Sequence, residues 1–238
     1  MIVLGLDASA GGVGAAVADA GGLRATVWVG RNSRPAASLL ALSERALSEA
    51  GLSVRDLRGI AVAVGPGSYA GVRASVVTGK ALAHAAELPL AAVGSLEAMA
   101  LAAGPWPGVI WAAIDARRGR VYAAAFRWEA GCVCVVQDPA LLERPSFHAA
   151  VGAQAGPRLL VGTGVSEDDL GALGGIAAEL WLGASGTPAA MAGAVALRGR
   201  EVLLGGQAVD PIALLPQYAG QPEIGRPPGP GRRASAPG

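Results

Sequence analysis

The chain has 238 residues, a formal net charge of +1 and an apolar composition. Hydrophobic residues make up 52% of it and charged residues 16%, against roughly 25% charged in an average domain. The length suits one large domain or two small ones. The near-neutral charge excludes the strong basic excess of a protein that grips nucleic acid by itself. The apolar excess has two interpretations, a bias toward Ala and Gly or a surface that a partner covers.

The first residues and the longest apolar stretch bear on secretion and membrane insertion. The first nine residues carry Asp7 and no basic region, so they predict a strand rather than a signal peptide. The apolar stretch 88–115 is interrupted by Glu97 and two prolines. It therefore falls short of the roughly 20 continuous apolar residues that a membrane span needs. We expect a cytoplasmic protein that makes no membrane contact.

The two cysteines, Cys132 and Cys134, lie two apart in an apolar run. On a strand both side chains would point to the same face. Structural zinc usually takes four nitrogen or sulfur ligands, and the only histidines are His84 and His148. We therefore expect two buried, reduced thiols rather than a metal site.

The first hundred residues predict a strand meander followed by alternating helices and strands. Glycine-rich turns separate the first apolar runs, as in an antiparallel meander. The first helix has Pro35 at its first turn and Gly51 just past its end. Ser95 is expected to cap a short helix. The predicted elements are strands 2–6, 13–18 and 23–29, helix 34–50, strand 60–64, helix 71–87, strand 90–93 and helix 95–103.

After a linker of sequence GPWPG at 104–108 the pattern restarts. Strand 109–114, a turn at 117–119 and strand 121–128 repeat the order of the first elements, with Asp7 aligned on Asp115 and Gly11 on Gly119. Because the matching strings head both halves, they indicate an internal duplication. The later predicted elements are strand 158–161 and a helix at 187–204 that Thr187 caps.

This order resembles the actin/Hsp70/sugar-kinase superfold, in which two ribonuclease-H-like halves face each other. We predict an α/β fold of two such subdomains, with mixed sheets flanked by helices. The predicted division is an N-terminal subdomain with dimerisation helices at 1–104 and a smaller, related C-terminal subdomain at 105–220. The remainder, 221–238, is rich in Pro, Gly and Arg and predicts a disordered tail.

The first turn is a candidate for nucleotide binding. In members of the superfold that bind nucleotide, the acidic residue after the first strand organises a metal near the phosphates. Small turn residues let backbone N–H groups approach the phosphate oxygens. The competing interpretation is that Asp7 merely closes an Asx turn. The residues of this degenerate candidate site are Asp7, Ser9, Gly11 and Gly12.

The second candidate site is the string GPGSYAGVR at 65–73, which follows a strand and opens a helix. Its glycines allow backbone dihedrals that other residues avoid, and Ser68 can cap the helix. Anion binding at the helix N-terminus and a rigid turn both stay open, although the loop lacks the Gly-Lys-Ser/Thr ending of a Walker A motif. The residues singled out are Gly65, Pro66, Gly67, Ser68, Gly71 and Arg73.

A stripe of small residues runs along the next helix. Gly79 in mid-helix costs about 1 kcal/mol of helix propensity, which close packing would offset. The stripe has two interpretations, a subunit interface or packing on the chain's own sheet. Its members are Ser75, Thr78, Gly79, Leu82, Ala83 and Ala86.

Asp115, followed by Arg117 and Arg118, heads the second half. It suits a second phosphate loop or a charged hairpin turn, and we favour the turn. With two histidines and no serine in a G-x-S-x-G setting, a hydrolase has little support.

The loop string at 65–73 resembles the G-P-G-S-F-T-G-[VL]-R signature of the TsaB family, with Tyr69 and Ala70 in place of Phe and Thr. Four further segments resemble the same family in the same order. Together they cover about residues 1–128, with a weaker echo at 210–223. The segments are 2–9 (IVLGLDAS), 80–98 (from KALA to GSLEA), 113–122 (from AIDAR to VY) and 210–218 (from DP to PQY).

The resemblance implies a role rather than a reaction. TsaB-like proteins are non-catalytic scaffold or activating subunits of the complex that forms threonylcarbamoyladenosine on tRNA. They pair with a TsaD-like transferase through helices of the first domain, work with a TsaE-like ATPase, and form homodimers through the same surface. The implied contact residues are Leu39, Ser75, Thr78, Gly79, Leu82, Ala83 and Ala86.

The resemblance also implies that the chain has no cofactor of its own, no catalytic residue and no metal. ATP and Mg²⁺ would belong to the partners, and tRNA would be contacted only indirectly. The alternative function is that of a small ATP-binding phosphotransferase or ATPase of the same superfold, working through Asp7, Ser9 and Asp115. A peptidase is a third option, against which the missing histidine pair argues.

Overall fold

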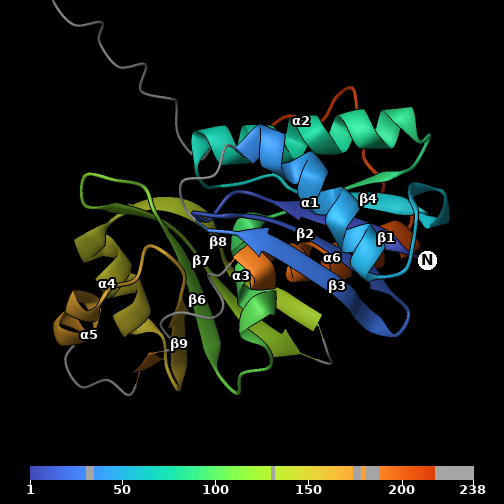
Figure 1. Ribbon diagram of the computed structural model, residues 1–238. Helices are drawn as coiled ribbons and strands as arrows, with labels where there is room; N and C mark the ends of the chain where they lie inside the picture. Colours follow the sequence, from blue (N-terminus) through green and yellow to red (C-terminus); the bar gives the residue numbers. More distant parts are fainter. Residues whose placement is uncertain (31–34, 130–131, 174–177, 181–187, 218–238) are drawn as a thin grey trace, which may run out of the picture.

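The computed structural model describes residues 1–30, 35–129, 132–173, 178–180 and 188–217, and these form two five-stranded sheets (Figure 1). The strands of the first sheet are β1 (Val3–Asp7), β2 (Val13–Asp19), β3 (Gly22–Val29), β4 (Gly59–Ala63) and β5 (Leu90–Val93). Those of the second are β6 (Val109–Asp115), β7 (Arg120–Glu129), β8 (Cys132–Glu143), β9 (Arg158–Val161) and β10 (Ala178–Leu180).

The two sheets have the same topology. Their strand orders are β3-β2-β1-β4-β5 and β8-β7-β6-β9-β10. In each, the first three strands pair antiparallel and the last two add in parallel. The duplication predicted from the sequence is therefore confirmed at the level of strand order.

The helices separate and cover the sheets. Their bounds are α1 (Pro35–Glu49), α2 (Tyr69–Ala85), α3 (Ser95–Ala103), α4 (Arg144–Ala153), α5 (Glu167–Ala172) and α6 (Pro188–Leu204), with a 3₁₀ turn at Val54–Asp56. Helices α1 and α2 cover the outer face of the first sheet, and α3 and α6 lie between the sheets (Figure 1). Helix α4 packs on the outer face of the second sheet, with α5 beside it.

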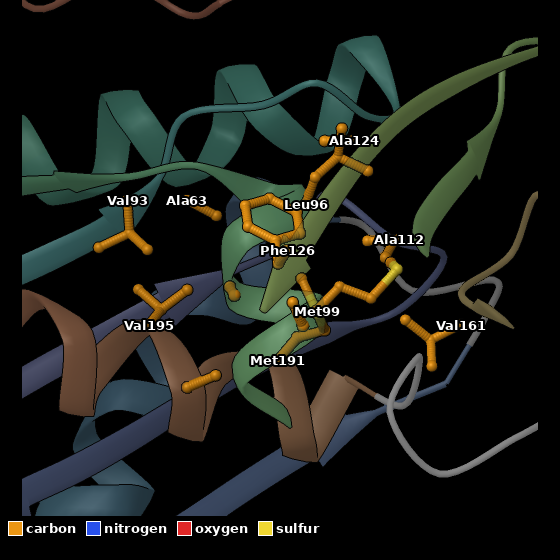
Figure 2. Close-up of a cluster of buried hydrophobic side chains, with 14 of the residues drawn as sticks. Ala63, Val93, Leu96, Met99, Ala112, Ala124, Phe126, Val161, Met191 and Val195 are labelled. Carbon is orange, nitrogen blue, oxygen red and sulfur yellow. The ribbon is translucent and has the colours of Figure 1, made fainter. Parts of the chain in front are cut away.

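The core between the sheets joins the two halves of the molecule. It brings together Val93 of the first sheet, Met99 of α3, Phe126 of the second sheet and Val195 of α6 (Figure 2). All four side chains are at most 1% exposed. Burial of apolar area on this scale stabilises one arrangement of the halves against each other.

Helix α6 belongs by packing to the first half, although it comes near the end of the chain. A Cβ placed on Gly5 of β1 would overlap the backbone of Ala196, and one on Gly199 would overlap the side chain of Ala61. Glycine at these two positions lets α6 lie directly on the first sheet. The predicted C-terminal unit, 105–220, therefore combines the second sheet with a helix, α6, that packs on the first sheet.

The elements with clear periodicity match their predicted places within about two residues. Two local predictions were wrong. Gly94, not Ser95, is the N-cap of α3, and Ser95 is its first residue. Cys132 and Cys134 are exposed rather than buried, because β8 is an edge strand. Thr187 and the tail 221–238 lie outside the described residues.

Candidate interlobe cleft

A cleft of about 490 Å³ lies where the two halves meet, at the ends of their first strands. Its walls are the turn after β1, the loop that enters α2, and the turn after β6. The second half thus supplies one side of the cleft and the first half the other. The lining residues are 9–11, 67–69 and 114–117, with Tyr122 and Thr163.

Both first strands end in the same Asx turn. Asp7 Oδ1 accepts a hydrogen bond from the Ser9 amide at 3.0 Å and one from Ser9 Oγ at 2.6 Å. Asp115 Oδ1 accepts one from the Arg117 amide at 2.9 Å, and its carboxylate lies 3.4 Å from the Arg117 guanidinium. Both aspartates therefore close Asx turns, as the turn interpretation of each predicts.

Asp7 and Asp115 differ in environment. Asp7 is 1% exposed, and its Oδ2 has no hydrogen-bond partner among the described residues. Burial raises the pKa of Asp7 to about 6, although the hydrogen bonds from Ser9 lower it in part. Ser9 and Gly11 line the cleft, whereas Asp7 and Gly12 are not among its lining residues. The acidic group of the candidate nucleotide site therefore lies behind Ser9.

The loop at 65–73 packs directly on the first turn. The Ser68 amide donates to the Ser9 carbonyl at 2.9 Å. A Cβ on Gly67 would lie 2.5 Å from the same oxygen, and one on Gly71 would overlap the carbonyl of Ala8. Two glycines of the loop are thus required by close backbone approach, which supports the rigid-turn interpretation.

Ser68 caps α2 as expected, since its Oγ accepts a hydrogen bond from the Gly71 amide at 3.4 Å. Gly65 has a φ of +110° and lies against the backbone of Gln217. Of the other two residues singled out in the loop, Arg73 is exposed and Pro66 is buried. Of the six residues singled out in this loop, Gly67 and Ser68 line the cleft.

The small-residue stripe of α2 faces the chain's own sheet. Ser75 and Ala83 are at most 1% exposed, and Gly79 lies against Val62 of β4. Leu39 of α1 is buried in the same core. Assigning these four residues to a partner interface was wrong at the level of side chains, because the core already covers them. Thr78, Leu82 and Ala86 are partly exposed.

The outward face of the two helices carries different residues. Leu40 of α1 is 49% exposed and Val77 of α2 is 57% exposed. Helical periodicity shows which residues share a face, but it does not show whether that face meets the chain's own sheet or a partner. The sequence did offer one signal for the outward face. Val77 is a large apolar residue that does not share the helical face of the small ones.

Some lining residues of the cleft were not singled out from the sequence. Tyr122 comes from β7 and Thr163 from the segment after β9. Tyr122 stood in a family-like string, whereas Thr163 had no signal at all.

Among the described residues, no group of three or more His, Cys, Asp or Glu side chains is placed to hold a metal ion. No helix in the described ranges is long and apolar enough to cross a bilayer.

Comparison with known proteins agrees with this architecture. The family model of TsaD, tRNA N6-adenosine threonylcarbamoyltransferase, matches residues 34–143. The chain is 41% identical over 85 residues to the tRNA threonylcarbamoyladenosine biosynthesis protein TsaB of Bacillus subtilis, and 36% identical over 129 residues to that of Escherichia coli. These stretches cover 36% and 53% of this chain, and 37% and 56% of the two relatives.

The likeness to a solved structure extends over nearly the whole chain. YeaZ from Pseudomonas aeruginosa is 27% identical, with a TM-score of 0.76 over 91% of this chain and 99% of that one. Two like five-stranded sheets, with helices between them and on their outer faces, define a protein of the actin/sugar-kinase fold type. Within that class, the chain is similar to the TsaB proteins over part of its length and to YeaZ over most of it.

Proposed function

We propose that the chain is a non-catalytic subunit in the biosynthesis of threonylcarbamoyladenosine on tRNA. The observation that carries the proposal is the similarity to YeaZ over 91% of the chain, together with the names of the curated relatives. In this role the chain pairs with a TsaD-like transferase and activates it, and a TsaE-like ATPase joins the complex. ATP and Mg²⁺ are cofactors of these partners.

The proposed contact surface is the outward face of α1 and α2. It exposes Leu40 and Val77 on the helix layer that covers the first sheet. The TsaD model matches a stretch that includes both helices, so a TsaD-like partner has a counterpart of this layer. Two like layers can pack face to face about a pseudo-twofold axis. The same geometry accounts for a homodimer when the partner is absent.

The cleft supports an accessory role better than a kinase-like one. The carboxylate of Asp7 is buried behind Ser9, and its raised pKa leaves it partly protonated near pH 6. Asp115 is engaged with Arg117. Asp115 lines the cleft and Asp7 does not, so the two carboxylates are not placed to hold a Mg²⁺-bound nucleotide as a pair.

The test is size-exclusion chromatography with light scattering on this chain mixed with the TsaD-like protein of its own organism. Val77→Glu places a charge on the proposed surface, and we expect binding at least about 30-fold weaker, as for a central interface residue. Val135→Glu is the matched control, since Val135 is 56% exposed on the other sheet. It should leave the complex intact.

Ala83→Glu does not serve this test, because Ala83 is 1% exposed and the charge would enter the core. A complex that survives Val77→Glu and Leu40→Glu would contradict the proposed surface. No complex under any nucleotide condition, together with Mg-ATP binding by the chain alone that Asp7→Ala abolishes, would favour the phosphotransferase alternative.

A further inference from the structure

Strand β8 presents both cysteines of the chain on one exposed face. Cys132 and Cys134 are free thiols, and both are exposed. Val133 between them pairs with Trp128 of β7, and both of these side chains pack against the core between the sheets. Because successive strand residues point to opposite faces, the two thiols lie next to each other on the face turned away from that core.

The spacing disfavours a disulfide between them. Two residues along a strand span about 7 Å, whereas a disulfide needs Cβ atoms roughly 3.5–4.5 Å apart. An intrachain disulfide would therefore require β8 to deform. A metal ion with bonds of about 2.3 Å to each sulfur can span the gap once the two thiols rotate toward each other.

The surroundings limit the number of ligands to two. Across the strand pair, Arg127 lies opposite Cys134 and Glu129 opposite Cys132. The Glu129 carboxylate is 3.6 Å from the Arg127 guanidinium. In the part of the chain that the structure describes, no third His, Cys, Asp or Glu completes a metal-binding group. Two thiols are too few for structural zinc, which takes four ligands, but soft thiolates select monovalent copper.

We infer that Cys132 and Cys134 form a two-thiolate site for a soft, two-coordinate cation of the monovalent copper class. Binding breaks two S–H bonds, forms two copper–sulfur bonds and releases two protons, with no change in oxidation state. The site lies on the second sheet, whereas the proposed partner surface covers the first. It is therefore independent of the proposed role in tRNA modification.

The test is an anaerobic titration of the full chain with Cu⁺ held by a chromogenic chelator that competes for the ion. We expect one Cu⁺ per chain. Cys132→Ser and Cys134→Ser should each bind about 100-fold more weakly, because the second thiol acts at a high effective concentration. Asp138→Ser on the same strand is the control and should bind like the parent. Binding should weaken as the pH falls, since each thiol must lose a proton.

Three outcomes of the titration would overturn the inference. These are unchanged affinity in either serine variant, an affinity no better than that of glutathione, and a copper-linked dimer in native mass spectra. A second readout uses phenylarsine oxide, which joins paired thiols with loss of one water. The parent should form a single adduct that consumes both thiols. A stable adduct on either serine variant would also overturn it.

Discussion

Gly71 at the start of α2 lies against the carbonyl oxygen of Ala8, at the end of β1, with no space for a side chain between them. This contact joins the loop at 65–73 to the first turn. Gly71→Ala would force the two backbones apart, so we expect it to lower the free energy of unfolding by about 1–3 kcal/mol or more. Urea unfolding followed by circular dichroism measures the loss.

The matched control for that substitution is Gly152→Ala. Gly152 lies within α4 and has open space around its α-carbon. Alanine there should raise the free energy of unfolding by about 0.5–1 kcal/mol through helix propensity. Equal effects of the two substitutions would show that the Gly71 contact carries no special constraint.

Asp7 predicts a pH dependence of stability. Burial raises its pKa from 3.8 to about 6, so between these values the folded chain holds a proton that the unfolded chain has released. Stability from this group is therefore full below about pH 4 and is lost as the pH rises through 6. Asp7→Asn keeps an acceptor for Ser9 and buries no charge. We expect it to exceed the parent by up to ~3 kcal/mol at pH 8.

The two proteins should be about equally stable at pH 4, and urea unfolding at pH 4, 6 and 8 measures the difference. Asp115→Asn is the control, because the Asp115 side chain is 39% exposed, and it should not reproduce this pH profile. If the free energies of unfolding of Asp7→Asn and the parent differ by the same amount at all three pH values, the explanation is contradicted.

Asp169 predicts the opposite pH dependence. Its side chain is fully buried at the start of α5, and it accepts hydrogen bonds from Arg144 and Ser166 while His148 Nε2 lies 2.7 Å away. Burial alone would raise the pKa of Asp169, but the contacts with Arg144, His148 and Ser166 outweigh it and lower that pKa. The stability that the carboxylate contributes is present above pH 4 and lost as the pH falls through its lowered pKa.

Asp169→Ala should lower the free energy of unfolding by about 3 kcal/mol at pH 7, because it leaves Arg144 without its buried partner. The deficit should shrink as the pH is lowered, since the parent then loses the same contribution. Asp138→Ala, an exposed substitution on β8, should change neither the free energy of unfolding at pH 7 nor its dependence on pH. A deficit that grows in acid would contradict this account.

Lys80, the only lysine of the chain, holds the segment after α6 against α2. Its Nζ donates hydrogen bonds to the carbonyls of Ile212 at 3.1 Å and Leu214 at 3.0 Å. Lys80→Met removes both, and loss of such bonds costs about 1–3 kcal/mol locally. Amide exchange at Leu214 and Gln217 should therefore become roughly 10–100-fold faster by local opening.

Hydrogen exchange with mass spectrometry measures the effect on that segment. Arg73→Met, on the exposed side of the same helix, should leave the exchange unchanged. Exchange that rises equally throughout the chain would indicate global destabilisation instead of a local tether.

Much of the fold was predictable from local pattern. Apolar runs between glycine turns identified β1 to β3, and Pro35 and Gly51 marked the ends of α1, because these signals depend only on neighbouring residues. The repeat of Asp7 at Asp115 indicated the duplication that the strand orders confirm. By contrast, β8, α4, α5 and β10 were not assigned, since their stretch carries little periodicity.

The sequence by itself determined the strand and helix order of the first half, and its loop string at 65–73 already resembled the TsaB signature. Only the tertiary structure decided which helix faces are covered. Periodicity groups Ser75, Gly79 and Ala83 on one face, but whether that face meets the chain's own sheet or a partner depends on residues distant in sequence. Likewise, Cys134 is exposed because β8 ends its sheet. Burial is a property of the assembled layers, and no local segment encodes what will lie across from it.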